Sequence, residues 1–414
     1  MTSDPGGLTF DWDGGEAAPP PPASVGFDDE TLRDGLQSPS ARHPRLDERI
    51  RFLELAAAVG IASADVGMPG AGSGAAADAE ALCRAIFERR LPIAPNCAAR
   101  ATERDIRPVL DIGQRLGAPV EVALFLPSSP VRCLVEGWTL AEVAGRVERW
   151  VGFAVRGGAP VTFVAEDATR SRPDALRSMM SAAVGAGAGR ICLADTVGQA
   201  TPLGAFRLAA FARRTLDEMG AAAVGLDWHG HDDRGLAVAS ALAAASGGAS
   251  RLHATALGVG ERAGNPAMEQ LLVNVRLLGW GRPELFGLMA YAAHASVMVG
   301  VAIPPGTPVV GRDAFRTSTG VHASAVVKAS RAGGDELADL VYSAVPAAWL
   351  GRAQEIEVGP MSGAANVRSW LARNGLRGDD TTVARVLAAA KAADRTLTDD
   401  ELRAAAAERG GGEG

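Results

Sequence analysis

The stretch "AVGLDWHGH", residues 223–231, is a short apolar run that ends in two histidines one residue apart. In an extended strand, residues at i and i+2 point to the same face, so His229 and His231 can present two imidazoles to one point in space. Taken alone, such a pair is more often explained by hydrogen bonding in a polar loop than by metal binding. The rest of the chain therefore decides what this stretch is.

Seven similar apolar runs occur along the chain, at a spacing of roughly thirty residues. Segments of helical period lie between them, and several of these end in Gly, as helix C-termini often do. Strand alternating with helix eight times predicts a (β/α)8 TIM barrel of about 250 residues. The other runs are "VGFDDE" near 25, "IASADVG" near 61, "LPIAPNC" near 91, "VEVALFLP" near 120, "PVTFVAED" near 160, "RICLADT" near 190 and "LHATALGVGE" near 252.

Most of these runs become polar at their C-terminal ends, which in such a barrel form the single face where chemistry takes place. Because strands one and seven are separated only by strand eight, Asp34 is expected beside His229 and His231. Two neutral imidazoles and one carboxylate suit a divalent ion that keeps positions open for substrate. The polar ends are Arg33/Asp34, Asp65, Asn96, Ser128/Ser129, Glu166/Asp167, Asp195/Thr196, His229/His231 and Glu261.

The composition is that of an ordinary soluble protein: 47% of the 414 residues are hydrophobic, 21% are charged, and the net charge is −7. The mild acidity and the lack of a basic run argue against a nucleic-acid partner. No apolar run is long enough to span a membrane, and the N-terminus lacks a signal-peptide pattern. Four cysteines without CxxC spacing favour a reduced, cytoplasmic protein.

The predicted organisation has three parts. Residues 1–23 are rich in Gly, Pro and acid and are expected to form a flexible leader. Residues 24–283 form the barrel, and residues 284–414 form a small, mainly helical region. The last stretch, residues 379–414, is expected to form two short helices and a frayed tail.

Five segments carry a family resemblance: "FDDETLRDGLQS", "AEDATRS", "LADTVGQATP", "WHGHDDRGLAVA" and "GVGERAGNP", in this order. Together they resemble the signature segments of the DRE-TIM metallolyase superfamily, in its 2-isopropylmalate synthase and homocitrate synthase branch. The resemblance covers about residues 25–280 and continues weakly to about 370. It implies a Claisen-type condensation of acetyl-CoA, as co-substrate, with a 2-oxo acid, followed by thioester hydrolysis.

The resemblance also implies a metal site that binds Mg, Mn or Zn. In the family the ion binds the 2-oxo acid through its carboxylate and keto oxygens and polarises the carbonyl as a Lewis acid. The ligands that correspond to the family motifs are Asp34 of "LRDG", His229 and His231 of "HGH", and Asn265 of "GERAGN".

Three further residues correspond to family residues at the barrel mouth. Arg33 resembles the arginine that stabilises the developing oxyanion, although it could instead pair with Asp28 or Asp29. Glu166 of "AEDA" resembles the glutamate that orients the catalytic groups, with a solvated strand-end residue as the alternative. Thr196 of "DTVG" matches a threonine that contacts the oxo acid.

The segment after the barrel carries a second part of the resemblance. "TSTGVHASAVVKAS" is similar to the family's "SGIH" stretch, which implies that His322 serves in acid–base chemistry on the acetyl methyl group. Tyr342 corresponds to a tyrosine near that site. In the family this segment reaches over the barrel of the partner subunit, which implies a homodimer. "VGPMSGAAN" departs from the family, because Met361 stands where a histidine is common.

The identity of the oxo acid stays open at this point. Arg132, after the fourth run, lies close to the position where homocitrate-type enzymes place an arginine for a distal carboxylate. The "GERAGNP" segment, in contrast, is more like the isopropylmalate branch. Arg132 could also be a surface residue or contact a CoA phosphate. We favour an oxo acid with an anionic side chain.

Two other classes of protein remain as alternatives. A lyase or aldolase of the superfamily would run a retro-reaction in the same barrel, but the cysteine of the hydroxymethylglutaryl-CoA lyase loop is absent beside residues 258–264. A scaffold paralogue should have lost its metal ligands, and all of them are present. The short C-terminal region leaves no room for the leucine-binding domain of regulated synthases, so leucine inhibition by that route is not expected.

Overall fold

The computed structural model describes Leu8 and residues 24–407. The predicted leader, residues 1–23, lies outside the described residues except for Leu8, and so does the predicted tail, residues 408–414. The chain divides into two compact units, Met1–Ala302 and Ile303–Gly414. Within residues 24–407, no helix has the length and apolar character that a membrane span requires.

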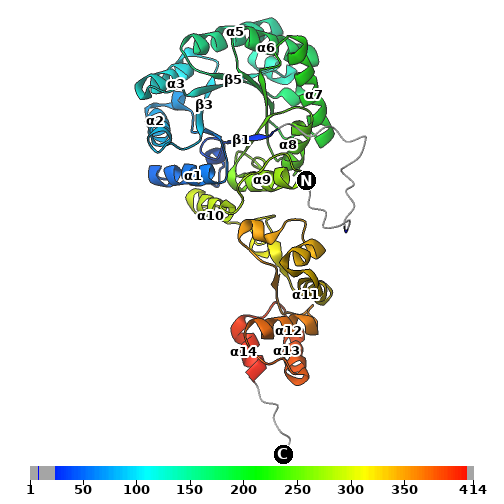
Figure 1. The fold of residues 1–414 in the computed structure, drawn as a ribbon. Coiled ribbons are helices and arrows are strands. Elements are labelled where there is room, and N and C mark those ends of the chain that lie inside the picture. The colour runs from blue at the N-terminus through cyan, green and yellow to red at the C-terminus, as the bar shows by residue number, and fades with distance from the viewer. Residues whose placement is uncertain (1–7, 9–23, 408–414) are drawn as a thin grey trace, which may run out of the picture. The chain divides into compact units, whose positions relative to one another are not determined.

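The first unit is a closed barrel of eight parallel strands that are hydrogen-bonded in chain order (Figure 1). The barrel closes because β1 pairs with β8, with Gly26 opposite Arg251. All eight predicted strands are therefore present, and the (β/α)8 barrel is confirmed. The strands are β1 (Gly26–Asp29), β2 (Ser63–Asp65), β3 (Ala94–Arg100), β4 (Glu121–Pro127), β5 (Val161–Glu166), β6 (Arg190–Asp195), β7 (Gly225–Gly230) and β8 (Arg251–Ala254).

The barrel helices are amphipathic and surround the strands. In α5, for example, a capping box of Thr139 and Glu142 fixes the first turn, and Val143, Val147 and Val151 form one buried stripe. The helices are α1 (Leu46–Ala58), α2 (Ser73–Glu88), α3 (Glu103–Leu116), α4 (Pro130–Glu136), α5 (Leu140–Arg156), α6 (Pro173–Gly185), α7 (Pro202–Glu218), α8 (Ala237–Ser246), α9 (Met268–Leu277) and α10 (Leu288–Val299).

Helix α10 belongs to the first unit, which therefore extends past residue 283. It lies beside α1: the His294 Nε2 is 2.9 Å from the carbonyl oxygen of Glu48. The buried Tyr291 of the same helix donates a hydrogen bond to Asp29 of β1. These contacts tie the helix to the start of the barrel.

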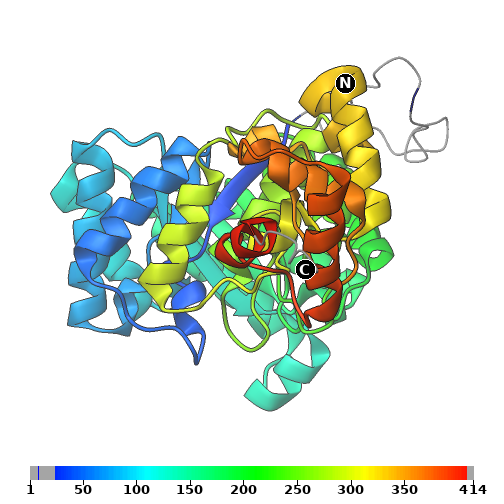
Figure 2. The same cartoon turned by 90° about the horizontal axis from the view of Figure 1, so that it is seen from below.

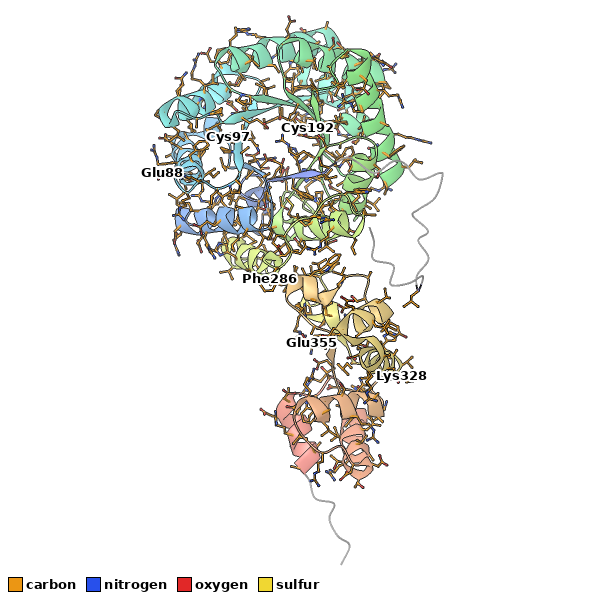
Figure 3. The ribbon with its side chains drawn as sticks, viewed as in Figure 1. Glu88, Cys97, Cys192, Phe286, Lys328 and Glu355 are labelled. Carbon is orange, nitrogen blue, oxygen red and sulfur yellow. The ribbon has the colours of Figure 1, made fainter. Side chains whose placement is uncertain are left out.

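The ring of strands is filled by side chains rather than open (Figure 3). One filled position corrects the sequence analysis, which placed Asn96 at the end of strand three. The strand continues to Arg100, and Asn96 points into the barrel, where its amide donates to Asp28 over 2.7 Å. After Asn96, the residues "CAA" are not polar enough to mark a strand end before Arg100.

The second unit is mainly helical, as predicted. Its last three helices pack around Val367, Trp370 and Val386 (Figure 2). The two short helices expected after residue 379 are confirmed as α13 and α14. The elements are β9 (Arg316–Thr317), α11 (Gly320–Tyr342), β10 (Glu355–Ile356), α12 (Ala364–Arg373), α13 (Asp380–Ala392) and α14 (Asp399–Ala407).

Candidate metal centre and active site

Three side chains meet at the C-terminal mouth of the barrel: His229 of β7, His231 directly after β7, and Asp34 after β1. The Nε2 atoms of His229 and His231 are 3.4 Å apart. The Asp34 Oδ2 atom lies 3.9 Å from the first of these nitrogens and 3.8 Å from the second. Side-chain alternation explains the pair: Gly230 lies between the two histidines, so they point to the same face, whereas Trp228, directly before His229, is buried. The predicted neighbourhood of these three residues is confirmed.

The spacing of these donors fits a divalent ion. Ligand atoms at 2.0–2.2 Å from a tetrahedral ion are separated by about 3.3–3.6 Å, close to the three observed separations. A fourth donor is present, because the buried Asn265 Oδ1 has no hydrogen-bond partner among the described residues. A Cβ added at Gly260 would lie 2.4 Å from that oxygen and 3.1 Å from Asp34 Oδ1, so both oxygens face the space that this glycine leaves open.

The protonation of His231 also favours metal binding. Its Nδ1 atom faces the carbonyl oxygen of Gly264 at 3.2 Å, which directs Nε2 toward Asp34. Burial, followed by the neighbouring His229, lowers the pKa of His231. The imidazole is therefore neutral near pH 7, which is the form that binds metals.

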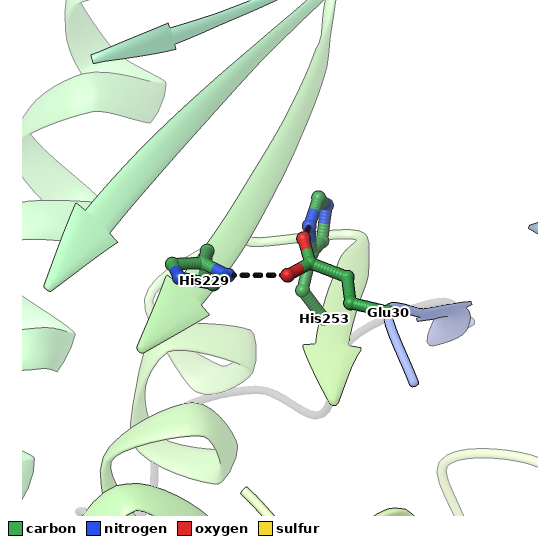
Figure 4. A group of neighbouring side chains, drawn as sticks. All are labelled: Glu30, His229 and His253. Carbon is green, nitrogen blue, oxygen red and sulfur yellow. Dashed lines mark hydrogen bonds and ion pairs between the residues drawn. The ribbon is translucent and has the colours of Figure 1, made fainter. Parts of the chain in front are cut away.

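Glu30 is a residue of the candidate site that the sequence analysis missed. One of its carboxylate oxygens lies 3.0 Å from His229 Nδ1 and accepts a hydrogen bond from Arg33; the other lies 2.6 Å from His253 Nδ1 (Figure 4). Burial would raise the pKa of Glu30, but Arg33 and His229 hold it well below its ordinary value. An ionised Glu30 thus orients a candidate metal ligand and the neighbouring arginine. The alternation of side chains along β8 could have indicated His253, because it lies two residues after Arg251 and so shares the inward face of the strand.

Arg33 contacts three carboxylates, and none of them is the predicted alternative of Asp28 or Asp29. Its Nη2 donates to Glu30, Nη1 to Asp34 over 2.9 Å, and Nε to Asp65 over 2.8 Å. Asp28 instead faces the barrel interior, and Asp29 accepts from Tyr291. Burial opposes the charge, but the three carboxylates raise the pKa of this guanidinium well above its ordinary value. Two of its five N–H groups remain for a substrate oxygen.

Glu166 and Arg132, predicted separately, lie together at the ends of β5 and α4. Arg132 Nη1 is 3.5 Å from Glu166 Oε1, and Nη2 donates to Glu136 over 3.2 Å. Burial raises the pKa of Glu166, and Arg132 partly offsets this shift. Thr196 lies close by, where its hydroxyl oxygen accepts from the backbone N–H of Asp167 over 2.8 Å.

His322 and Tyr342 lie in the second unit and contact each other. Their rings are stacked with centroids 4.1 Å apart, although the residues mark opposite ends of α11. The helix breaks at Gly333 and Gly334, and the latter has a φ of 71° that suits glycine. Both side chains remain accessible to a reactant. Their predicted roles in acid–base chemistry stay predictions.

The fold and the donor set define a TIM-barrel protein with a candidate metal centre at its mouth. The chain belongs to the HMGL-like family, whose family model matches residues 24–290. A probable 2-isopropylmalate synthase of Ignicoccus hospitalis is 31% identical over 389 residues, which cover 92% of this chain and 91% of that protein.

Two more comparisons describe how far the likeness extends. A probable 2-isopropylmalate synthase of Methanopyrus kandleri is 34% identical over 313 residues, 74% of this chain but only 59% of the relative. The solved structure of hydroxymethylglutaryl-CoA lyase from Pseudomonas aeruginosa matches with a TM-score of 0.56 and 19% identity, over 71% of this chain and 97% of that one. This second likeness concerns the fold alone.

Proposed function

We propose that this protein is a divalent-metal-dependent synthase that condenses acetyl-CoA with a 2-oxo acid and then hydrolyses the thioester. The observation that carries the proposal is the donor set of Asp34, His229, His231 and the unpartnered Asn265 oxygen, with the Arg33 guanidinium bonded to one of its members. The 2-isopropylmalate synthase names of relatives that span most of this chain support it.

The four donors would hold the ion, which when bound would polarise the carbonyl of the oxo acid as a Lewis acid. Arg33 adds a fixed cation at the same place. Because Glu30, Asp34 and Asp65 hold its half-buried guanidinium in place, it needs no reorganisation when negative charge develops on the carbonyl oxygen. Its two free N–H groups would donate to that oxygen.

The acetyl methyl group must lose a proton before it attacks the oxo acid. We assign this proton to His322, assisted by Tyr342 and Glu166. The raised pKa of Glu166 suits proton transfer, because a carboxyl with a pKa closer to working pH is a more effective acid or base. The assignment requires the second unit of one subunit to reach a barrel mouth, and we propose that a cytoplasmic homodimer provides this arrangement.

We propose Thr196 and Arg132 as the residues that bind the oxo acid. Arg132 has a buried Nε with no hydrogen-bond partner among the described residues, although its terminal nitrogens contact Glu166 and Glu136. A guanidinium at the mouth favours an oxo acid whose side chain carries a second negative charge.

The test is free-thiol release from acetyl-CoA with Mg or Mn, against 2-oxoisovalerate, pyruvate, oxaloacetate, 2-oxoglutarate and phosphonopyruvate, each repeated with chelator. Metal-dependent release with one of these acids supports the synthase, and preference for a dianionic acid supports Arg132 as its reader. A lyase of the same family would instead release acetyl-CoA from a 3-hydroxyacyl-CoA such as hydroxymethylglutaryl-CoA. Cleavage without any condensation would refute the proposal.

A further inference from the structure

His253 is a buried histidine whose two ring nitrogens both face carboxylates. Its Nδ1 lies 2.6 Å from Glu30 Oε1, and its Nε2 lies 3.3 Å from Asp227 Oδ2 (Figure 4). Because the side chain is only 5% exposed, water cannot replace its contacts with Glu30 and Asp227. Such a ring donates from both nitrogens when it is protonated, and each contact then joins opposite charges.

The group of Glu30, His229 and His253 contains the residue types of a metal site, but its distances are those of direct hydrogen bonds. Two ligands of the same ion are separated by about 3 Å or more, because each lies about 2.0–2.2 Å from it. The 2.6 Å separation of His253 Nδ1 from Glu30 Oε1 is that of a charge-assisted hydrogen bond. Glu30, His229 and His253 are therefore joined by direct hydrogen bonds, and we call this group the clamp.

The clamp is anchored on the side away from the candidate metal centre. Asp227, which faces His253 Nε2, also accepts from Arg190 over 2.8 Å and from Arg251 over 2.8 Å. Arg251 continues the network to Glu121 over 3.0 Å. A chain of buried ion pairs therefore runs from the lower barrel interior to Glu30, and from Glu30 to His229 and Arg33.

We propose that His253 is a positioning residue. It holds Glu30 on the side away from the candidate metal centre, so that Glu30 keeps the metal ligand His229 and the oxyanion-binding Arg33 in their orientations. The inference deepens the proposed function and rests on it. Glu30 contacts His229, Arg33 and His253. Of these three side chains, His253 is the one that binds neither the metal nor the substrate, and it holds Glu30 in place. His253 thus acts on both halves of the site without touching substrate.

Two neutral variants of the same residue test this role. The amide nitrogen of Asn reaches the position of Nδ1, so His253→Asn keeps a donor toward Glu30, whereas the amide of Gln reaches the position of Nε2, so His253→Gln keeps only the contact with Asp227. Both remove the same charge. We expect His253→Gln to weaken Mn²⁺ binding about 10- to 100-fold, as changes behind a metal ligand typically do, and His253→Asn to weaken it much less.

The readout is the Mn²⁺ dissociation constant of the full chain, measured by isothermal titration calorimetry without substrates, together with the melting temperature. Glu121→Gln is the matched control, because it neutralises a member of the same network that does not contact Glu30. Its Mn²⁺ affinity should stay at the wild-type value. In a Glu30→Gln background the difference between the two His253 variants should vanish, because the residue they act through has been changed.

Equal Mn²⁺ affinity in the Asn and Gln variants, or a difference that persists with Glu30→Gln, would overturn the inference. If neither His253 variant folds, Asp227→Asn changes only the carboxylate that faces His253 Nε2 and should still weaken Mn²⁺ binding. Unchanged Mn²⁺ affinity in Asp227→Asn would also overturn the inference. A wild-type chain that binds no divalent ion would instead refute the proposed function, so the two failures are distinguishable.

Discussion

Two groups of a carboxylate and two histidines share His229, and they differ in spacing rather than in residue type. In the group of Asp34, His229 and His231, the donor atoms are 3.4–3.9 Å apart, which leaves room for an ion between them. In the group of Glu30, His229 and His253, the carboxylate lies 3.0 Å and 2.6 Å from the two rings, and hydrogen bonds occupy the space. The distances in the first group are thus 0.4–1.3 Å longer than those in the second, and this difference distinguishes a candidate ligand set from the residues that support it.

The protonation states of the histidines also distinguish the two groups. Burial lowers the pKa of His231, which keeps that imidazole neutral. Burial also opposes a charge on His253, but Asp28, Asp227 and Glu30 raise its pKa to about 10. One group therefore offers neutral imidazole nitrogens and a carboxylate to an ion, and the other is a completed set of ion pairs.

The largest expected effect comes from breaking the first group alone. His231→Ala removes one ligand and should lower metal-dependent turnover by about 10³-fold or more, because a Lewis acid supplies several kcal/mol of transition-state stabilisation. The melting temperature should change little, since the second group stays intact. Thiol release and thermal unfolding measure the two effects. His43→Ala, at an exposed position, is the control. Full activity in His231→Ala would refute the metal assignment.

Breaking the second group should affect both stability and metal binding. Glu30→Gln leaves the buried His253 without one of its carboxylates and should cost about 3 kcal/mol in the free energy of unfolding. Metal affinity should fall about 10- to 100-fold, because His229 loses its orienting partner. Urea unfolding and calorimetry test this result. Glu103→Gln, an exposed carboxylate on α3, should change neither quantity, and a Glu30→Gln protein of wild-type stability would contradict the ion-pair interpretation.

The contrast also marks what could be predicted from the sequence. The eight strands and the first group were predictable, because polar residues at strand ends and the HxH spacing are visible in the letters. Glu30 and His253 were not found: Glu30 stands among other charged residues in "DDETLRD", and His253 is a single histidine in the run "LHATALGVGE". The alternative partners of Arg33, Asp28 and Asp29, are not its contacts, because their side-chain directions depend on strand parity and on the Tyr291 that packs from α10.

A third buried carboxyl, Glu269, extends the comparison, because no cation is among the described groups that shift its pKa. Burial raises the pKa of Glu269 to about 7, although its Oε2 accepts from the Leu257 N–H over 3.0 Å. The folded state therefore favours the neutral acid, and its contribution to stability is complete below the unfolded pKa and is lost as pH rises toward 7. Wild-type stability should fall by about 3 kcal/mol from this group between pH 4.5 and 8.

Glu269→Gln separates this contribution from those of Asp29 and Asp65, whose raised pKa values act in the same direction. The amide oxygen still accepts from Leu257 and does not titrate. Relative to wild type, the variant should gain stability as pH rises from 5 to 8, measured by urea unfolding at each pH. Glu88→Gln at an exposed position of α2 is the control. Parallel pH curves for Glu269→Gln and wild type would contradict the assigned pKa.

The smallest effect concerns the looser pair of Glu166 and Arg132, 3.5 Å apart and with 40% of the arginine side chain exposed. Burial raises the pKa of Glu166 and Arg132 lowers it, so Arg132→Gln should raise this pKa further. If Glu166 must be ionised, activity is lost as pH falls through its pKa, and the acid limb of the kcat/KM profile should move to higher pH. Arg132→Lys retains the charge and should leave that limb nearer its wild-type position. If the acid limb of the Arg132→Gln profile does not move, Glu166 takes no part in the proton transfer. If the limb moves and the KM for dianionic oxo acids also rises, the Arg132 guanidinium both lowers the pKa of Glu166 and binds the oxo acid.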